Sequence, residues 1–280
     1  MKPAGEFVYL NGQVLPAERA AISPFDVGIL RGYAVFDLLQ TIGGQPYMLA
    51  EHLARFRSSA QRLHLLVPAS DEEITAAILE LLARNRHEEA TVRLVLTGGY
   101  SADGMHYDPS SPTFFILTHE LFDVPREYYE TGAKLVTREY RREFPEAKTT
   151  NYITWLHSHP QIEAAGALDV LYYADGAISE AATASFYVVK DGRILAPSEG
   201  VLWGTVGTRV LQLAEEHYEV VHRQVELREA FEADETFLTS SVRDVVPITR
   251  LDDRPVGDGR VGPITRHLMQ LYASVRHTEY

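Results

Sequence analysis

The sequence of 280 residues contains no cysteine, only four lysines and no long hydrophobic run. The absence of cysteine excludes disulfide bonds, a thiolate nucleophile and cysteine ligands for a metal. No segment approaches the ~18 consecutive apolar residues that a membrane-spanning helix needs, and no secretory signal is visible at the amino terminus. We therefore expect a soluble, cytoplasmic protein, and the sequence predicts no metal site.

Basic residues are also scarce relative to acidic ones. The chain has 39 Asp and Glu residues against 26 Lys and Arg residues, a formal net charge of −13. This charge argues against binding to nucleic acid, whose phosphates attract basic surfaces. The hydrophobic fraction of 45% and the charged fraction of 23% are those of a globular protein. At ~150 residues per domain the length favours two domains, which we expect to act on a small molecule.

Hydrophobic spacing predicts a strand-rich amino-terminal domain over residues 1–118. Asn11-Gly12 is a strong hairpin signal between strands at 7–10 and 13–16. Further strands are expected over 35–41, 91–97 and 112–118, and helices over 50–63 and 71–85. Ser70 is the expected N-cap of the second helix.

The remaining chain predicts a short linker and a second mixed domain. We place the linker at 119–130 and the carboxy-terminal domain at 131–280. Strands are expected over 134–137 and 170–173 and near 220, 236 and 245. A hairpin is expected over 185–195, and helices over 152–165, 206–217 and from Pro263 onward. The fold class is therefore mixed α/β (α+β) with interleaved antiparallel hairpins.

Three segments could carry chemistry, and for each the residues alone leave two interpretations open. Lys148, in a polar stretch before a helix, is either a solvated lysine or a Schiff-base lysine. Glu180 lies among small residues, as an exposed acid at a strand end or as a carboxylate beside a flat ligand. The glycine-rich residues 202–208 open a helix whose backbone N–H groups suit an anion, or are ordinary capping residues. Ser241, after an expected strand, offers further donors.

Five segments together resemble the fold-type IV pyridoxal-phosphate enzymes, the class IV aminotransferases. These segments are 29–37, 51–63, 148–152, 179–197 and 237–248. The resemblance implies a small amino-terminal domain, a larger carboxy-terminal domain, pyridoxal 5'-phosphate between them, and a homodimer. Within the pattern, Thr205-Val206 replaces the usual Ile-Thr, and Ala181 and Ser185 replace a Gly or Ser and an Asn.

The resemblance also implies roles for individual residues. Lys148 would form the Schiff base and move the proton, and Glu180 would pair with the pyridine nitrogen. Arg55 would bind the phosphate as a charged fork. The backbone amides of Thr205 and Val206, with Ser241, would complete the phosphate site. Leu202 would pack against the cofactor ring, and Tyr152 would lie near its 3-hydroxyl.

Strand alternation and the resemblance together suggest substrate-facing positions. Phe36, Leu38 and Gln40 lie on one face of their strand, at positions that contact substrate in the family. Branched-chain aminotransferases typically have Arg at the position of Gln40. Well-known D-amino-acid aminotransferases have Tyr at Phe36 and an Arg-x-His carboxylate trap, whose arginine is absent from residues 103–106 here.

Arg31 and Arg93 are the candidate carboxylate ligands in place of that trap. Arg31-Gly32-Tyr33 followed by Phe36-Asp37 resembles a branch of D-amino-acid aminotransferases without the usual trap. We therefore expect transfer of an amino group, with a D-amino acid as the favoured donor, to a 2-oxo acid such as 2-oxoglutarate or pyruvate. The alternatives are a branched-chain L-amino-acid or (R)-amine transaminase, an aminodeoxychorismate lyase, and a ligand-binding protein on an enzyme scaffold.

Overall fold

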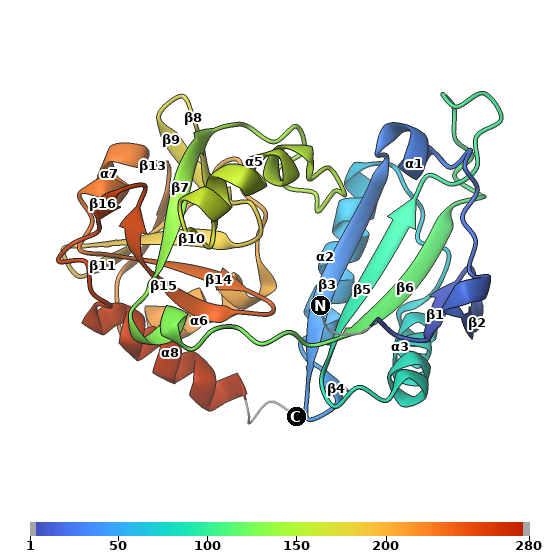
Figure 1. The fold of residues 1–280 in the computed structure, drawn as a ribbon, viewed down its shortest axis with the longest axis horizontal. Helices are drawn as coiled ribbons and strands as arrows, with labels where there is room; N and C mark the ends of the chain where they lie inside the picture. The colour runs from blue at the N-terminus through green and yellow to red at the C-terminus, as the bar shows by residue number, and fades with distance from the viewer. Residues whose placement is uncertain (1–3, 277–280) are drawn as a thin grey trace. The chain divides into compact units, whose positions relative to one another are not determined.

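The structure is a computed structural model that describes residues 4–276. Contacts between Cα atoms divide the chain into two compact units (Figure 1). The first unit comprises residues 4–123 and 147–151, and the second comprises residues 124–146 and 152–276. Along residues 4–276, no helix combines the length and the hydropathy needed to cross a membrane.

The first unit contains six strands and four helical segments. The strands are β1 (Phe7–Leu10), β2 (Gln13–Pro16), β3 (Ala34–Ile42), β4 (Gln45–Pro46), β5 (Ala90–Thr97) and β6 (Thr113–Glu120). The helical segments are the 3₁₀ turn η1 (Ala17–Arg19), α1 (Val27–Arg31), α2 (Leu49–Arg62) and α3 (Asp71–Asn85).

The strands of the first unit form one antiparallel sheet in the order β2-β1-β6-β5-β3-β4. Helices α2 and α3 cover one face of it. The apolar side chains of Leu53, Phe56 and Ala60, spaced as on one face of a helix, pack with Val35 and Leu39 of β3. Phe36, Leu38 and Gln40, which alternate with these residues, therefore lie on the opposite face of β3, which α2 and α3 do not cover.

Local signals in the first unit are confirmed. Asn11 and Gly12 both have positive φ, 46° and 92°, as the predicted two-residue hairpin turn requires. Ser70 caps α3 in a capping box, since its hydroxyl accepts from the Glu73 amide at 3.2 Å and its own amide donates to the Glu73 carboxylate at 2.7 Å.

The segment 147–151, far from β3 in sequence, lies along the beginning of that strand, on the edge that β4 covers only at Thr41 and Ile42. The Phe36 amide donates to the Lys148 carbonyl at 2.9 Å, and the Thr150 amide donates to the Ala34 carbonyl at 3.0 Å. The Lys148 amide donates to the Ser59 hydroxyl of α2 at 3.0 Å. The backbone of Lys148 is therefore held from both β3 and α2.

The second unit contains ten strands and five helices. The strands are β7 (Ala133–Glu139), β8 (Asp169–Ala174), β9 (Ala177–Ala181), β10 (Ser185–Lys190), β11 (Arg193–Pro197), β12 (Val220–Arg223), β13 (Val225–Glu226), β14 (Glu235–Ser240), β15 (Asp244–Leu251) and β16 (Arg254–Pro255). The helices are α4 (Glu127–Glu130), α5 (Ile153–Ala164), α6 (Thr205–Glu215), α7 (Leu227–Phe231) and α8 (Pro263–Arg276).

These strands form one mixed sheet in the order β12-β11-β10-β14-β15-β7-β8-β9-β13, with β16 paired to β15. The pairs β11/β12, β15/β7 and β7/β8 are parallel and the others antiparallel. Strand β9 also contacts β10 and β11, so the sheet curls around its own apolar core. Helices α6 and α8 pack against β14 and β15, and α5 packs against β7 and β8.

One short element differs from the sequence expectation. Arg31 is the last residue of helix α1, a helix that the hydrophobic spacing of the sequence did not predict. The Asp26 carboxylate caps this helix by accepting from the Gly28 amide at 2.7 Å, and it also accepts from the hydroxyls of Thr97 at 2.8 Å and Thr113 at 2.6 Å. These three contacts hold the helix on the ends of β5 and β6, and Gly32 ends it with a φ of 66°.

Candidate active site

In the first unit, the side chain of Phe36 lies next to two cations. The Lys148 ammonium is 4.7 Å from the centre of the Phe36 ring, and the Arg93 guanidinium is 5.3 Å from it. Both distances allow cation–π attraction. Arg93 pairs with Leu38 across β5 and β3, so its exposed side chain lies on the Phe36 face of the sheet, away from α2 and α3.

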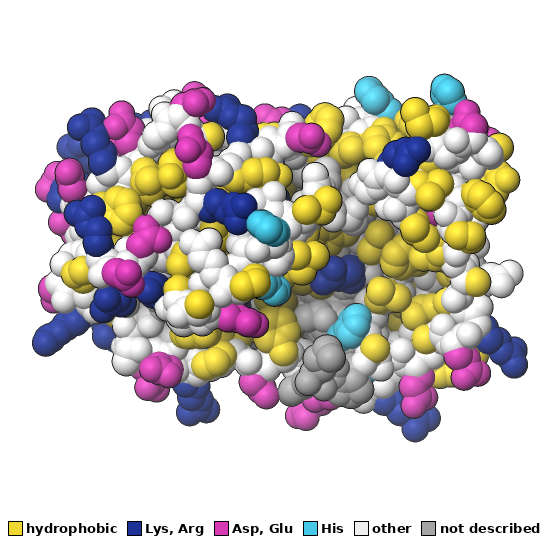
Figure 2. All heavy atoms as spheres, turned by 45° about the horizontal axis from the view of Figure 1, so that its top comes forward, with side chains coloured by type: hydrophobic (Ala, Val, Ile, Leu, Met, Phe, Trp, Pro, Cys, Tyr) yellow, Lys and Arg dark blue, Asp and Glu magenta, His cyan; other side chains and the backbone are white. Residues whose placement is uncertain are grey.

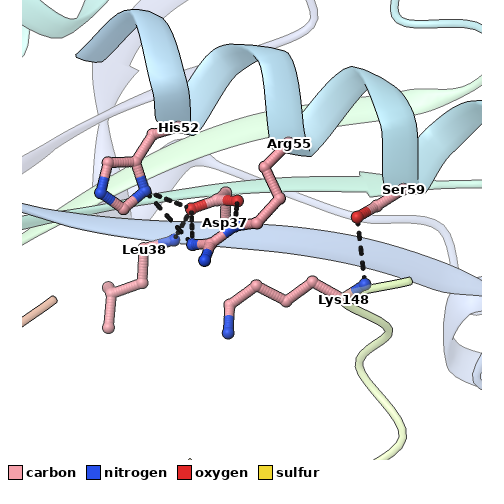
Figure 3. A network of polar contacts seen from close by, with 6 residues as sticks. All are labelled: Asp37, Leu38, His52, Arg55, Ser59 and Lys148. Atoms are coloured by element: carbon pink, nitrogen blue, oxygen red, sulfur yellow. Dashed lines mark hydrogen bonds and ion pairs between the residues drawn. The ribbon is translucent and has the colours of Figure 1, made fainter. Parts of the chain in front are cut away.

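Arg55 of α2 forms a two-point ion pair with Asp37 of β3 (Figure 3). Its Nε donates to Asp37 Oδ2 and its Nη2 donates to Asp37 Oδ1, each at 2.8 Å. His52, one turn earlier on α2, places Nδ1 2.7 Å from Asp37 Oδ1. In Figure 3 the Lys148 side chain runs along β3 toward this group. A guanidinium has five N–H donors, so the pair with Asp37 occupies only part of the set.

Burial and charge determine the protonation of this group. Burial would raise the pKa of Asp37, but the charge of Arg55, then that of His52, and the hydrogen bonds from both outweigh it and lower this pKa well below its ordinary value. Burial lowers the pKa of His52, against the opposing effect of Asp37 and with the help of the Arg55 and Lys148 charges. The network therefore combines an ionised carboxylate and a guanidinium with an imidazole whose charged form is disfavoured by burial.

The other substrate candidates of the first unit lie on β3 and α1. Gln40 is buried with 2% of its surface exposed, and Leu38 is partly buried. Arg31 is exposed at the end of α1, where its Nη2 lies 3.3 Å from the sulfur of Met105. Met105 belongs to the loop that follows β5, so Arg31 and this loop lie side by side.

In the second unit, Glu180 of β9 is a buried carboxylate with an amide donor at one oxygen and a guanidinium ion-paired with the other. The Leu202 amide donates to its Oε2 at 3.3 Å, and Arg142 Nε lies 3.2 Å from its Oε1. The same guanidinium is 5.7 Å from the centre of the Tyr152 ring. Of the residues predicted to contact the cofactor, Glu180 and Tyr152 therefore both lie beside Arg142, and Leu202 contacts Glu180.

The first turn of α6 lies directly on strand hydroxyls because two of its residues are glycine. A Cβ at Gly204 would be 2.7 Å from the Ser185 hydroxyl, and one at Gly207 would be 2.3 Å from the Tyr187 hydroxyl. Gly204, at the N-cap, has no side chain to cover the turn. The remaining predicted phosphate ligands are nearby in sequence or at the end of β14: Thr205 and Val206 are buried, and Ser241 is partly buried after that strand.

Three residues of this arrangement were not predicted: Asp37 and His52 as partners of Arg55, and Arg142 as the partner of Glu180. Asp37 carried a signal, since an acidic residue on the core face of an apolar strand needs a buried cation. Arg142 carried none, because it stands in the charged run 141–143.

The similarity of the chain to known proteins agrees with this geometry. The family model described as "Amino-transferase class IV" matches residues 34–251. The chain belongs to the class IV aminotransferases. A Methanocaldococcus jannaschii protein that bears the provisional name branched-chain-amino-acid aminotransferase is 31% identical, with 96% of each chain covered. The D-alanine aminotransferase of Listeria monocytogenes serotype 1/2a is 26% identical over 95% of this chain and 94% of its own.

A solved structure is similar along the whole chain. The T.th. branched-chain amino acid aminotransferase with pyridoxamine 5'-phosphate superposes with a TM-score of 0.89 at 25% identity, covering 100% of this chain and 96% of that one. The mixed α/β class and the pyridoxal-phosphate-dependent aminotransferase assignment are thus confirmed, because class IV aminotransferases use pyridoxal 5'-phosphate.

The residues present suit this cofactor. A phosphate needs cations and backbone donors; the first unit offers a guanidinium at Arg55, and the second, taken by itself, offers the open first turn of α6. A pyridinium nitrogen needs a buried carboxylate, and Glu180 is one, with 4% of its surface exposed. A lysine is required at the aldehyde, and Lys148 carries its amine beside Phe36.

Proposed function

We propose that this enzyme transfers the amino group of a D-amino acid to a 2-oxo acid such as 2-oxoglutarate or pyruvate. The observation that carries the proposal is the placement of Arg93 and Lys148 around the Phe36 ring. A substrate whose Cα lies at the Lys148 amine would have a carboxylate within reach of the Arg93 guanidinium. A cation in this position favours amino acids over amines without a carboxylate.

Each part of the cofactor, and the proton transfer, would be served by different residues of this chain. When bound, pyridoxal 5'-phosphate supplies an aldehyde that takes up the amino group and a ring that withdraws electrons from Cα. Lys148 would hold the aldehyde carbon and afterwards carry the proton between Cα and the cofactor. Glu180 would keep the pyridine nitrogen protonated. Arg55, the first-turn amides of α6 at Thr205 and Val206, and Ser241 would bind the phosphate, while Leu202 and Tyr152 would contact the ring.

The substrate-facing side chains support an amino acid of modest size. Phe36 and Leu38 are apolar, and Gln40 brings no charge where branched-chain aminotransferases typically have Arg. Relatives named for both branched-chain amino acids and D-alanine are similar to this chain, so these two substrate classes are the principal competitors. The missing Arg-x-His trap sets this chain apart from the well-known D-amino-acid aminotransferases. What favours the D-amino acid is the pattern Arg31-Gly32-Tyr33 followed by Phe36-Asp37, which resembles the branch without the trap, together with Arg93 as a further cation for the carboxylate.

The discriminating experiment is a panel of substrates followed by the absorbance of the bound cofactor. Purified holoenzyme is mixed with D-alanine, D-glutamate, L-leucine, L-valine and an (R)-amine, and single-turnover rates are compared. Fastest reaction with a D-amino acid supports the proposal. Fastest reaction with L-leucine or L-valine selects the branched-chain alternative, and with the (R)-amine the amine transaminase. Pyruvate release from aminodeoxychorismate without an acceptor identifies the lyase, and binding without turnover identifies a ligand-binding protein.

We also propose a homodimer. Large hydrophobic side chains are exposed around α1 and the loop after β5, where Figure 2 shows them gathered on the surface of the first unit; they are Ile22, Phe25, Ile29, Leu30, Tyr100 and Met105. A patch of this kind marks an interaction surface. Light scattering on the eluting protein should give twice the chain mass of 31.4 kDa, and a monomer at micromolar concentration would contradict the proposal.

A further inference from the structure

We propose that Arg142 is a positioning residue that couples Glu180 to Tyr152, the two side chains assigned to the two sides of the cofactor's pyridine ring. This inference rests on the proposed roles of Glu180 at the ring nitrogen and Tyr152 near the 3-hydroxyl. It concerns a residue with no assigned contact to substrate or cofactor, which would act through the two side chains that have one.

The contacts of Arg142 leave its guanidinium little freedom. Nε lies 3.2 Å from Glu180 Oε1, and Nη2 donates to the Ala182 carbonyl at 2.6 Å. The guanidinium carbon lies 5.7 Å from the centre of the Tyr152 ring and 5.9 Å from the centre of the Tyr172 ring. A planar fork with donors at fixed angles is suited to such simultaneous contacts, and a flexible ammonium is not.

The buried guanidinium of Arg142 needs a compensating negative charge, and the carboxylate of Glu180 supplies it. Burial tends to lower the pKa of Arg142, but the charge of Glu180 and then the interactions with Tyr152 and Tyr172 outweigh it and raise this pKa above its ordinary value. The ionisable groups that face it are Glu180 from β9, Tyr172 from β8 and Tyr152 before α5. Tyr172 in turn lies in the field of Asp169, Tyr140 and Arg138.

The coupling has an electronic consequence. Arg142 fixes the carboxylate of Glu180 through one oxygen, and the Leu202 amide contacts the other. The ring nitrogen would therefore meet a carboxylate whose orientation is set by the ion pair with Arg142 and whose negative charge that guanidinium partly offsets. A cation within 4–6 Å of a titrating group lowers its pKa by about one to three units. Removing Arg142 should shift the protonation of the bound cofactor toward higher pH.

The test uses the holoenzyme and four forms of it: wild type, R142M, R142K and R141M. Arg141 is the matched control, because it is adjacent in sequence but pairs with Asp175 at the surface, where both side chains are largely exposed. For each form, cofactor affinity is measured by titration with pyridoxal 5'-phosphate, and cofactor absorbance is recorded against pH. Thermal unfolding without cofactor reports any purely structural damage.

We expect R142M to raise the midpoint of the absorbance titration by about one pH unit and to weaken cofactor binding roughly tenfold. R142K, which keeps the charge and loses the fork, should shift the midpoint less, and R141M should match wild type. If R142M unfolds at a lower temperature but keeps the absorbance midpoint of wild type, Arg142 has only a structural role, and the inference is overturned.

If R142M does not fold, R142K still tests the inference. An R142K midpoint and affinity equal to wild type would also overturn the inference, because one ammonium cannot reproduce the contacts to Glu180, Tyr152 and the Ala182 carbonyl together. If the wild type itself takes up no pyridoxal 5'-phosphate, the proposed function fails first, and that outcome is recognised before any variant is compared.

Discussion

Arg55 and Asp37 are joined by two parallel hydrogen bonds, each 2.8 Å long, between α2 and β3. Asp37 is fully buried, with none of its surface exposed. The guanidinium assigned to the cofactor phosphate is thus already oriented by a carboxylate of the first unit, and the negative charge of Asp37 offsets part of its positive charge. Arg55 is therefore preorganised, and binding phosphate need not immobilise a flexible side chain.

Replacing Asp37 with Asn should destabilise the first unit and weaken cofactor binding. The variant leaves Arg55, whose side chain is 12% exposed, without its anion, and breaking a buried pair in this way typically costs about 3–5 kcal/mol of folding free energy. Urea unfolding and titration with pyridoxal 5'-phosphate would measure the two effects. The control is Asp71→Asn, which removes a partly exposed pair with Arg57 and should cost under ~1 kcal/mol. Equal losses of unfolding free energy and of cofactor affinity in both variants would show that the buried pair with Asp37 stabilises the protein no more than an exposed pair does.

The stability of the apoprotein should fall as the pH is lowered from 7 to 5. Because burial keeps the pKa of His52 below its ordinary value of 6.5, the unfolded chain binds a proton in this range that the folded chain does not. Asp37, whose folded pKa is depressed, adds a further loss as the pH falls below about 4. Urea unfolding at several pH values measures the slope. His52→Gln should flatten it between pH 7 and 5, whereas an unchanged slope would assign the dependence to other groups.

Lys148→Ala should abolish transamination and leave the protein folded. The side chain reaches the Phe36 ring, and its loss removes the amine while the backbone bonds to β3 and α2 remain. Activity and circular dichroism are compared with those of Lys190→Ala, whose lysine pairs with Asp234 elsewhere. Normal turnover by the Lys148 variant would end its assignment as the Schiff-base lysine.

Glu180→Gln should retain cofactor and react more slowly. A neutral amide stabilises a pyridinium poorly, and each pKa unit of lost stabilisation corresponds to ~1.4 kcal/mol, or about tenfold in rate. Stopped-flow measurement of the half-reaction with D-alanine tests this expectation. A rate constant equal to that of wild type would place Glu180 away from the ring nitrogen.

Arg93→Ala and Arg31→Ala should each raise the KM for D-amino acids and for 2-oxoglutarate by roughly ten- to a hundredfold. A charge-assisted hydrogen bond to a carboxylate contributes about 1.5–3 kcal/mol, and an (R)-amine without a carboxylate should be much less affected. The measurement is kcat/KM for D-alanine, D-glutamate and an (R)-amine, with cofactor content as control. Equal losses on all three substrates would indicate structural damage. No loss on any would return the amine-transaminase alternative to first place.

Much of the fold follows from local sequence signals, and the parts that do not are short or depend on long-range contacts. The Asn11-Gly12 turn and the Ser70 cap were readable because each uses adjacent residues. Helix α1 has only five residues and is held by contacts of Asp26 with β5 and β6, so no periodicity reveals it. Strand β9 is hidden in a run of small residues.

The candidate site shows the same division. Resemblance to the family indicated Lys148, Glu180 and Arg55, because such residues stand in recognisable motifs. Arg142 could not be found in this way: its neighbours in sequence are charged, and its partners lie about ten and forty residues further along the chain. Only the folded sheet of the second unit brings them together.

The chain passes between the two compact units three times, because residues 147–151 group with the first unit while their flanks on both sides group with the second. A ribosome that has released residues 1–123 has therefore not yet released all of the first unit. The edge of β3 that receives Lys148 and Thr150 must wait for a later stretch of chain. A proteolytic cut after Asp123 would likewise yield an amino-terminal fragment that lacks residues 147–151, the segment that hydrogen-bonds to the edge of β3 and carries Lys148.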